Sequence, residues 1–204
     1  MFMNYQSFRT AFSDYPLFTS GDFAGLGEKI YYHRLVEWQK KGYIRRMAKN
    51  VFTFRGNRPD EWMLFLVANK LYAPSYISLE SALSLHGLIP ETTFAITSVS
   101  SKKTTRFESE SGLYIYRKVK PALMFGYDLK VYRNTAIRIA TPEKAILDFL
   151  YLNPGLEDQG KLEELRINCD EFAGINFKKI TAWLKYIDSP AITRRFRKLE
   201  RIVR

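Results

Sequence analysis

The first fifty residues alternate apolar and polar positions with the period of short helices. Aromatic side chains recur at spacings of three and four residues over residues 4–12, which predicts a helix. A second short helix is expected after an N-cap at Thr19 or Ser20. Gly25 and Gly27 then predict a tight turn.

A longer helix is predicted over residues 28–41. Its inner face would carry Tyr31, Leu35 and Trp38, which are spaced for one side of a helix. Gly42 follows in the position of a C-cap, directly after two lysines in the last turn.

Two short β runs come next, over residues 43–47 and 51–54, and they predict a small hairpin. Helix, helix, glycine turn, helix and basic hairpin is the element order of a winged helix-turn-helix. Any small α/β domain with the same element order is the alternative. A Gly- and Pro-containing break at residues 55–59 sets the predicted boundary, so residues 1–58 form the expected DNA-binding domain and residues 59–204 a second domain.

The second domain is expected to contain a helical connector, a β-rich stretch and a helical end. The start of one helix is marked by Pro59, and that of another by Thr141-Pro142-Glu143. The connector (residues 59–92) would hold helices over 59–71 and 78–86. The β-rich stretch (93–141) would hold strands over 93–99, 105–107, 113–119, 128–133 and 137–140. The helical end (142–204) would hold helices over 143–152, 156–167, 176–187 and 190–203. The predicted class is α+β: a winged helix-turn-helix, then a mixed α/β domain with an antiparallel sheet and C-terminal helices.

Charge changes this picture, because it is large and unevenly distributed. The formal net charge is +11 and the pI about 9.7, which favours a polyanionic partner. Residues 1–58 carry ten Lys and Arg against four Asp and Glu, a net charge of +6. Residues 93–141 carry +6 and residues 189–204 carry +5, whereas residues 59–92 and 142–188 carry −3 each.

The remaining composition argues against several classes of protein. A single cysteine excludes an internal disulfide and a cysteine-rich metal site, and no apolar run approaches the roughly 20 residues that span a membrane. The N-terminus lacks the pattern of a signal peptide, so a cytoplasmic protein without membrane partner, metal or cofactor is expected. His33 and His86 are isolated, Cys169 is expected to be buried or idle, and the acidic pairs at 157–158 and 163–164 to form a solvated face. No catalytic activity is expected.

In a winged helix-turn-helix, the predicted helix over residues 28–41 would enter the major groove of DNA. Arg and Lys can pair with guanine there, while Tyr and His can contact bases or phosphates. The hairpin would contact the DNA backbone or minor groove. The candidate DNA-binding residues are Lys29, Tyr32, His33, Arg34 and Lys40 in the helix, and Arg45, Arg46, Lys49, Asn50 and Arg55 in and after the hairpin.

The other two basic blocks suggest additional contacts. One lies in the β-rich stretch, and the other is a basic amphipathic helix at the C-terminus, whose apolar stripe argues that it docks on its own protein with its charges outward. DNA phosphate, an acidic protein partner and a membrane surface all remain open for that helix. The candidate residues are Lys102, Lys103, Arg106, Arg117, Lys118, Arg194, Arg195 and Arg197.

Four segments together resemble one protein family. PSYISLESALSLHGLIPE at residues 74–91 resembles the central motif of the AbiEi-family antitoxins, and ATPEKAILDFLY at residues 140–151 resembles their strand-to-helix motif. The basic segment at residues 101–106 and the Tyr-rich segment at residues 113–118 fit the same family. The resemblance covers roughly residues 5–152 and leaves the last fifty residues unmatched.

The resemblance implies a role in a type IV toxin–antitoxin, or abortive-infection, system. Such antitoxins repress their own operon through the winged domain and counter a nucleotidyltransferase toxin. Two copies on an inverted-repeat operator in double-stranded DNA are expected. A stand-alone transcription factor whose C-terminal domain senses a ligand or protein is the main alternative. A nuclease is a second one, and it would require a carboxylate cluster formed by Glu91, Asp128, Glu143 and Asp148.

Overall fold

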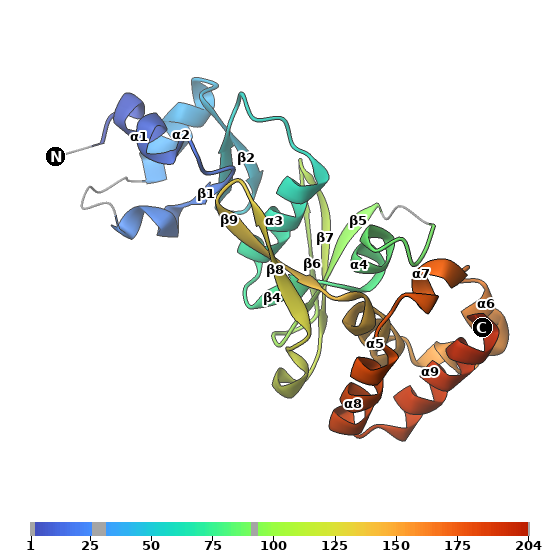
Figure 1. Ribbon diagram of the computed structural model, residues 1–204. Coiled ribbons are helices and arrows are strands. Elements are labelled where there is room, and N and C mark those ends of the chain that lie inside the picture. The colour runs from blue at the N-terminus through green and yellow to red at the C-terminus, as the bar shows by residue number, and fades with distance from the viewer. Residues whose placement is uncertain (1–2, 26–31, 91–93, 204) are drawn as a thin grey trace.

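The computed structural model describes residues 3–25, 32–90 and 94–203, and it has the α+β architecture expected (Figure 1). Its α-helices are α1 (Tyr5–Phe12), α2 (Tyr32–Lys40), α3 (Glu61–Leu71), α4 (Leu79–Leu85), α5 (Pro142–Leu152), α6 (Gln159–Glu163), α7 (Cys169–Ala173), α8 (Phe177–Ile187) and α9 (Pro190–Val203). Its strands are β1 (Phe18–Thr19), β2 (Ile44–Ala48), β3 (Val51–Phe54), β4 (Ser75–Ile77), β5 (Ala95–Ser100), β6 (Thr105–Ser109), β7 (Gly112–Lys118), β8 (Tyr127–Tyr132) and β9 (Thr135–Ala140). Short 3₁₀ helices are η1 (Ser20–Gly25), η2 (Pro121–Leu123) and η3 (Pro154–Glu157).

The N-terminal unit is built around an aromatic core. Asn4 caps α1 by accepting a hydrogen bond from the main-chain N–H of Ser7 at 2.9 Å, which starts the helix so that Phe8 and Phe12 face inward. Phe8 stacks on Trp38 of α2 with ring centroids 4.7 Å apart. Beside these helices lies a three-stranded antiparallel sheet in the order β1-β3-β2. β1 was not predicted, because two residues are too few to show strand periodicity.

A six-stranded sheet in the order β6-β7-β5-β4-β9-β8 forms the centre of the molecule. The expectation of an antiparallel sheet is wrong, since β5 runs parallel to β7 and β4 parallel to β9. The short strand β4, which lies between β5 and β9, was not predicted. Tyr116 and Ile137 are buried in the core that this sheet shares with α3, and the Tyr116 hydroxyl donates to the Ala68 carbonyl in α3 at 2.8 Å.

The starts of two central helices follow from their capping residues. Thr141 caps α5 and Pro142 is its first residue, as predicted. Pro59, however, is not the first residue of α3. Asp60 is the N-cap instead, and its carboxylate accepts from the Met63 N–H at 2.8 Å.

The last fifty residues form a helical lobe at the end of the molecule opposite α1 and α2 (Figure 1). The single helix predicted over residues 156–167 is wrong. Asp158 caps a new short helix, α6, after η3, and Arg166 takes a left-handed φ of 48°, which a continuous α-helix cannot contain. Asn168 then caps α7, which was not predicted. The helices predicted over 176–187 and 190–203 are confirmed as α8 and α9.

The N-terminal unit has its own aromatic cluster, but the larger core of the central sheet extends across the predicted boundary after residue 58. Leu17, Met47 and Val51 from the N-terminal unit belong to the same buried cluster as the central sheet. At the turn between β6 and β7, the Ser111 hydroxyl donates to the Met47 carbonyl of β2 at 2.6 Å and bonds the Tyr114 hydroxyl at 2.7 Å. The hairpin β2–β3 is therefore packed against the central sheet.

Candidate nucleic-acid interface

Helix α2 separates an apolar inner face from a polar outer face. Leu35 and Trp38 are buried in the aromatic core, which turns Tyr32, His33 and Lys40 to the exposed side. Their exposure was predicted from the period of the helix; contact with DNA stays a prediction. The predicted first turn of this helix, with Lys29 and Tyr31, lies outside the described residues.

Arg34, the remaining helix candidate, is part of an ion-pair chain on the outer side of α2. Its guanidinium lies 2.8 Å from the Glu37 carboxylate, and the Lys41 ammonium lies 2.7 Å from the same carboxylate. Hydrogen bonds from Lys41 and then Arg34 lower the pKa of Glu37, so the carboxylate is held ionised. Sequence reasoning missed Glu37, although its spacing of three and four residues from the two cations is visible in the sequence.

The hairpin β2–β3 presents a polar, basic tip. Asn50 adopts the left-handed conformation with a φ of 60°, and both Lys49 and Asn50 are exposed. The Asn50 side chain also accepts a 3.4 Å hydrogen bond from the Ser20 N–H, which ties the tip to η1. Arg46 is exposed as well, and its Nε donates to the Ala48 carbonyl at 3.3 Å.

Arg45, a predicted contact for the DNA backbone or minor groove, is also bound to the protein's own main chain. Its side chain is half-buried, and its guanidinium donates to the Asn57 carbonyl at 3.1 Å, so it anchors the chain that leaves the hairpin. The side chains of Arg45, Arg46 and Arg55 nevertheless share a groove of about 380 Å³ with Gln39 of α2. Glu110, from the turn between β6 and β7, lines the same groove. No pattern in the sequence could place Glu110 there, because it is more than fifty residues away.

The basic residues of the β-rich stretch divide into exposed and anchored groups. Lys103, Arg106 and Lys118 are exposed, as expected. Lys102 is exposed too, with its ammonium 5.3 Å from the centre of the Tyr72 ring. Arg117 differs from the expectation, because it is half-buried and donates to the Leu152 carbonyl at 2.8 Å, which joins β7 to the end of α5.

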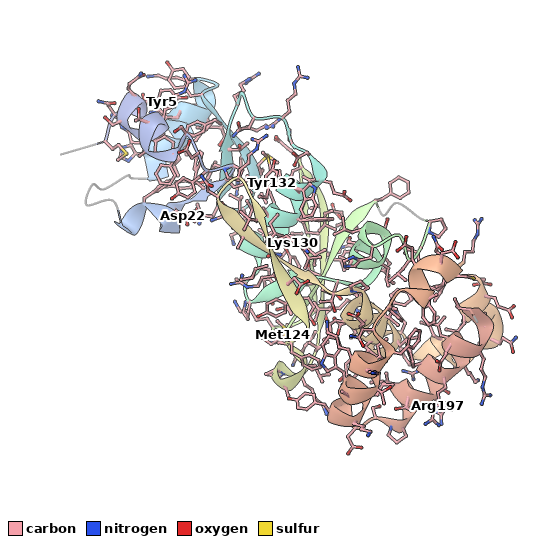
Figure 2. The ribbon with its side chains drawn as sticks, in the orientation of Figure 1. Tyr5, Asp22, Met124, Lys130, Tyr132 and Arg197 are labelled. Atoms are coloured by element: carbon pink, nitrogen blue, oxygen red, sulfur yellow. The ribbon has the colours of Figure 1, made fainter. Side chains whose placement is uncertain are left out.

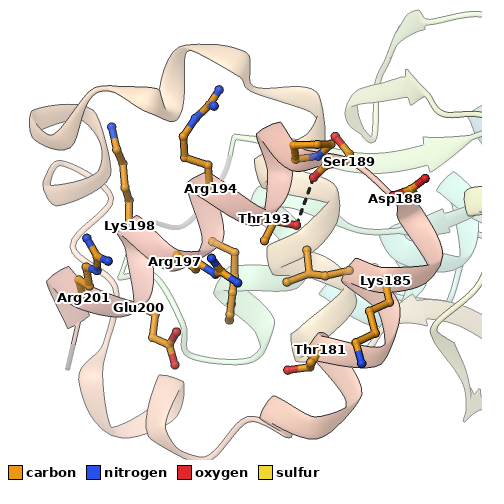
Figure 3. Close-up of a pocket in the computed structure, with 13 residues that line it drawn as sticks. Thr181, Lys185, Asp188, Ser189, Thr193, Arg194, Arg197, Lys198, Glu200 and Arg201 are labelled. Carbon is orange, nitrogen blue, oxygen red and sulfur yellow. Dashed lines mark hydrogen bonds between the residues drawn. The ribbon is translucent and has the colours of Figure 1, made fainter.

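Helix α9 carries its cations on two sides, and both lie far from α2. Arg194 and Arg195 both reach Glu157 of η3, at 2.9 and 3.3 Å. Arg195 is only 7% exposed and donates to the Leu150 carbonyl, so the prediction that its charge points outward is wrong. Arg197 is exposed beside a groove of about 730 Å³ between α8 and α9 (Figure 3). It lies among the C-terminal helices, at the opposite end of the molecule from Tyr5 of α1 (Figure 2).

The central domain also contains a buried polar network. The Lys144 ammonium forms an ion pair with the Asp148 carboxylate and donates to the Tyr76 hydroxyl at 2.8 Å. Asp148 accepts from the hydroxyls of Tyr76 and Ser78 at 2.8 and 2.9 Å. Ser78 is the N-cap of α4, yet its side chain bonds Asp148 rather than the helix.

Three of the four carboxylates that a nuclease would need are described, and they do not form a cluster. Glu143 accepts from the Asn176 N–H, Asp148 is paired in the core, and Asp128 lies on the outermost strand, β8. Glu91 lies outside the described residues. Among the residues that are described, no three His, Cys, Asp or Glu side chains are grouped to hold a metal ion.

The histidine and cysteine that sequence analysis set aside have ordinary surroundings. His86 ends α4, and its Nε2 is 2.8 Å from the Ala140 carbonyl, which agrees with a capping or packing role. Cys169 is exposed rather than buried. Within the described ranges, no helix is long and apolar enough to cross a membrane.

Comparison with known proteins adds no family assignment. No family model and no curated protein sequence matches this chain.

Proposed function

We propose that residues 1–58 form a winged helix-turn-helix that binds double-stranded DNA, and that the chain is a transcriptional repressor without catalytic activity. The element order α1–β1–η1–α2–β2–β3 and the strand order β1-β3-β2 support this assignment. In this arrangement α2 enters the major groove, and the hairpin β2–β3 is the wing that contacts the adjacent backbone.

The observation that carries the proposal is the groove shared by α2 and the hairpin. Gln39 comes from the reading helix, and Arg45, Arg46 and Arg55 come from the hairpin and its exit. Three guanidinium groups of the hairpin and its exit that line one groove beside α2 can neutralise backbone phosphates while the helix lies in the adjacent major groove. Exposed Lys49 at the hairpin tip extends the same basic surface.

A titration of labelled DNA from upstream of the gene tests the proposal. The logarithm of the binding constant should fall linearly with the logarithm of salt concentration, with a slope of about −0.9 for each phosphate neutralised. Arg46→Ala and Lys49→Ala should each weaken binding to all sequences alike and reduce that slope by about one. Arg34→Ala should mainly relax the preference for the upstream sequence over an unrelated duplex.

Lys178→Ala provides a matched control, because Lys178 is an exposed lysine of the helical lobe opposite the winged unit. It should leave binding unchanged. If all four substitutions have the same effect, or none has any, the assignment of α2 and the hairpin as the DNA interface is refuted.

We further propose that the chain is the antitoxin of a type IV toxin–antitoxin system and counters a nucleotidyltransferase toxin from the same operon. Two observations support this proposal: the resemblance to the AbiEi family, and the direct contact between the two motifs at residues 74–91 and 140–151. β4 and the N-cap of α4, from the first motif, contact α5, from the second, through the bonds from Tyr76 and Ser78 to Asp148.

A growth-rescue assay separates neutralisation from repression. The nucleotidyltransferase-like product of the neighbouring gene is expressed from an unrelated promoter, so that repression of the native operon cannot rescue growth. Rescue by the wild-type chain and by the Arg46→Ala, Lys49→Ala double variant would support the antitoxin role. A lack of rescue by the well-expressed wild-type chain would favour the alternative, a transcription factor that senses a ligand or protein, for which the groove between α8 and α9 is the candidate site.

A further inference from the structure

The strand β8 is an outer edge of the six-stranded sheet, and its free side is unpaired among the described residues. Leu129 is paired with Arg138 of β9. The main-chain N–H of Arg138 donates to the Asn69 side chain at 2.7 Å rather than to β8, so Leu129 and Arg138 form a non-hydrogen-bonded pair of the ladder. Hydrogen bonding alternates along an antiparallel ladder. The N–H and C=O groups of Leu129 and Val131 therefore point outward from the sheet edge.

The side chains of this edge strand are unusual for a surface. Leu129 is 60% exposed and Val131 is 77% exposed, although both are large and apolar. Their cross-strand neighbours Arg138 and Ala136 are also exposed, so this face of the hairpin β8–β9 is not covered by the rest of the molecule. An uncovered strand with outward backbone groups and apolar side chains is a template for pairing with another strand.

The opposite edge of the same sheet is different. Strand β6 exposes Arg106 and Glu108, while Phe107 between them is half-buried. Both edge strands thus expose one acidic and one basic side chain, but only β8 adds exposed large apolar side chains, because Phe107 packs against the rings of Tyr72 and Tyr116. The two edges are therefore not equivalent, and β8 is the one suited to a partner.

We propose that β8 pairs antiparallel with β8 of a second copy of this chain, with Leu129 opposite Leu129 across a two-fold axis. In this register Asp128 of each copy faces Lys130 of the other, so the pairing makes two cross-strand ion pairs. Tyr127 faces Val131 at both ends of the contact. The strand is thus complementary to itself, as a two-fold interface requires.

Charge selects this register over its neighbours. Outward backbone groups occur at every second residue, so the nearest alternatives shift the pairing by two residues. One of them places Lys130 opposite Lys130, and the other places Asp128 opposite Asp128; like charges directly opposite are destabilising. Figure 2 shows Lys130 and Tyr132 along this strand, in the middle of the molecule and away from both ends.

The inference rests on the proposed function in one respect, because two copies on an inverted repeat would meet at this edge. A contact of one short strand is smaller than a standard stable interface, so it is weak between free molecules. Two copies held on neighbouring half-sites would meet at about millimolar effective concentration, which favours a weak contact. The contact then makes binding to the two half-sites cooperative.

A cysteine cross-link tests the pairing without DNA. The lone cysteine is removed by Cys169→Ser and a new one is placed on the axis by Leu129→Cys. A hydrogen-bonded antiparallel pair has Cα atoms about 5.5 Å apart, within the range for a disulfide. The control pair, Arg106→Cys with Cys169→Ser, places the thiol on the other edge. Oxidation of the full chain at high concentration should form the dimer at least about tenfold faster with the thiol at residue 129.

A charge swap then tests the register. Adding Asp128→Lys should reduce the cross-linking rate to that of the control, and adding Lys130→Asp as well should restore it. Equal rates for the two edges, or no response to the swap in variants with unchanged circular dichroism, would overturn the proposal. Binding to a duplex with a single half-site tests the winged unit separately, so failure of the proposed function would be distinguishable from failure of this contact.

Discussion

Removal of one partner of the buried Lys144–Asp148 pair should destabilise the protein more than removal of both. The side chains are 1% and 3% exposed, so neither charge can be solvated by water if its partner is lost. Lys144→Met leaves the Asp148 carboxylate with only the hydroxyls of Tyr76 and Ser78. Asp148→Asn leaves the ammonium facing the rings of Tyr76 and Phe125.

The expected size follows from the cost of an uncompensated buried charge. Breaking such a pair costs about 3–5 kcal/mol, whereas replacing both members by neutral groups costs much less. For a chain of this length, each kcal/mol shifts the melting temperature by about 2–4 °C, so each single variant should melt about 6–20 °C lower. The double variant Lys144→Met, Asp148→Asn should lose less stability than either single variant.

The pH dependence has a defined sign. Burial raises the pKa of Asp148, and Lys144 opposes that effect. Without Lys144 the folded pKa lies above the unfolded value of about 3.9, so stability is lost as the pH rises above that value. The deficit of Lys144→Met should therefore shrink as the pH approaches 4. Urea unfolding followed by circular dichroism measures these values. Additive losses in the double variant, or single losses below about 1 kcal/mol, would refute the reasoning.

Three further substitutions test separate parts of the molecule. Glu37→Gln removes a carboxylate from α2, the proposed DNA-reading helix, so affinity for upstream DNA should rise about two- to fivefold at low salt, and the gain should fade at high salt, as measured by fluorescence anisotropy. Arg195→Met should lower the free energy of unfolding in urea by about 2–3 kcal/mol, because it removes the hydrogen bonds of a charged group to the Leu150 carbonyl and Glu157. Burial opposes ionisation of Glu143, but hydrogen bonds and a nearby lysine outweigh it and lower its pKa. The stability that this carboxylate supplies is present above about pH 4.3 and lost as the pH falls through the folded pKa, so Glu143→Gln should cost stability at pH 7 and much less near pH 3, as measured by thermal unfolding.

Each of these predictions has an outcome that contradicts it. Equal or weaker DNA affinity of the Glu37 variant would mean that the carboxylate holds Arg34 in its reading position rather than competing with phosphate. Unchanged stability of the Arg195 variant would show that the buried guanidinium contributes no net stabilisation. A cost at Glu143 that does not depend on pH would assign its role to packing.

Local sequence signals predicted those elements whose ends are set by neighbouring residues. The cap at Thr141 with Pro142, the amphipathic stripe of α9 and the hairpin β2–β3 are all encoded within a few residues, and all were found. The strands β1 and β4 are stabilised by partners distant in the sequence, so their own residues carry little periodicity. The parallel pairings within the central sheet could not be predicted for the same reason.

For the candidate site too, the sequence predicted what depends on neighbouring residues and not what depends on distant ones. Exposure of Tyr32, His33 and Lys40 follows from the buried stripe of α2 and was predicted from the period of the helix. Arg45 and Arg195 were assigned by charge alone, and charge does not reveal that a main-chain carbonyl elsewhere binds the guanidinium. A basic residue beside an apolar stripe can therefore be either a contact for a partner or an anchor of the fold.

The bond from Ser111 to the Met47 carbonyl, together with the shared burial of Leu17, Met47 and Val51, limits how this protein can be divided or recombined. A DNA-binding domain that is stabilised only by its own hydrophobic core can be transferred intact to another protein. In this chain the hairpin β2–β3 uses the central sheet as part of its support, so a graft of residues 1–58 onto another chain would expose Leu17, Met47, Ala48 and Val51 and free the hairpin. Under the proposed DNA-binding role, specificity for new DNA sequences is better sought by changing the outer face of α2 than by exchanging the whole unit.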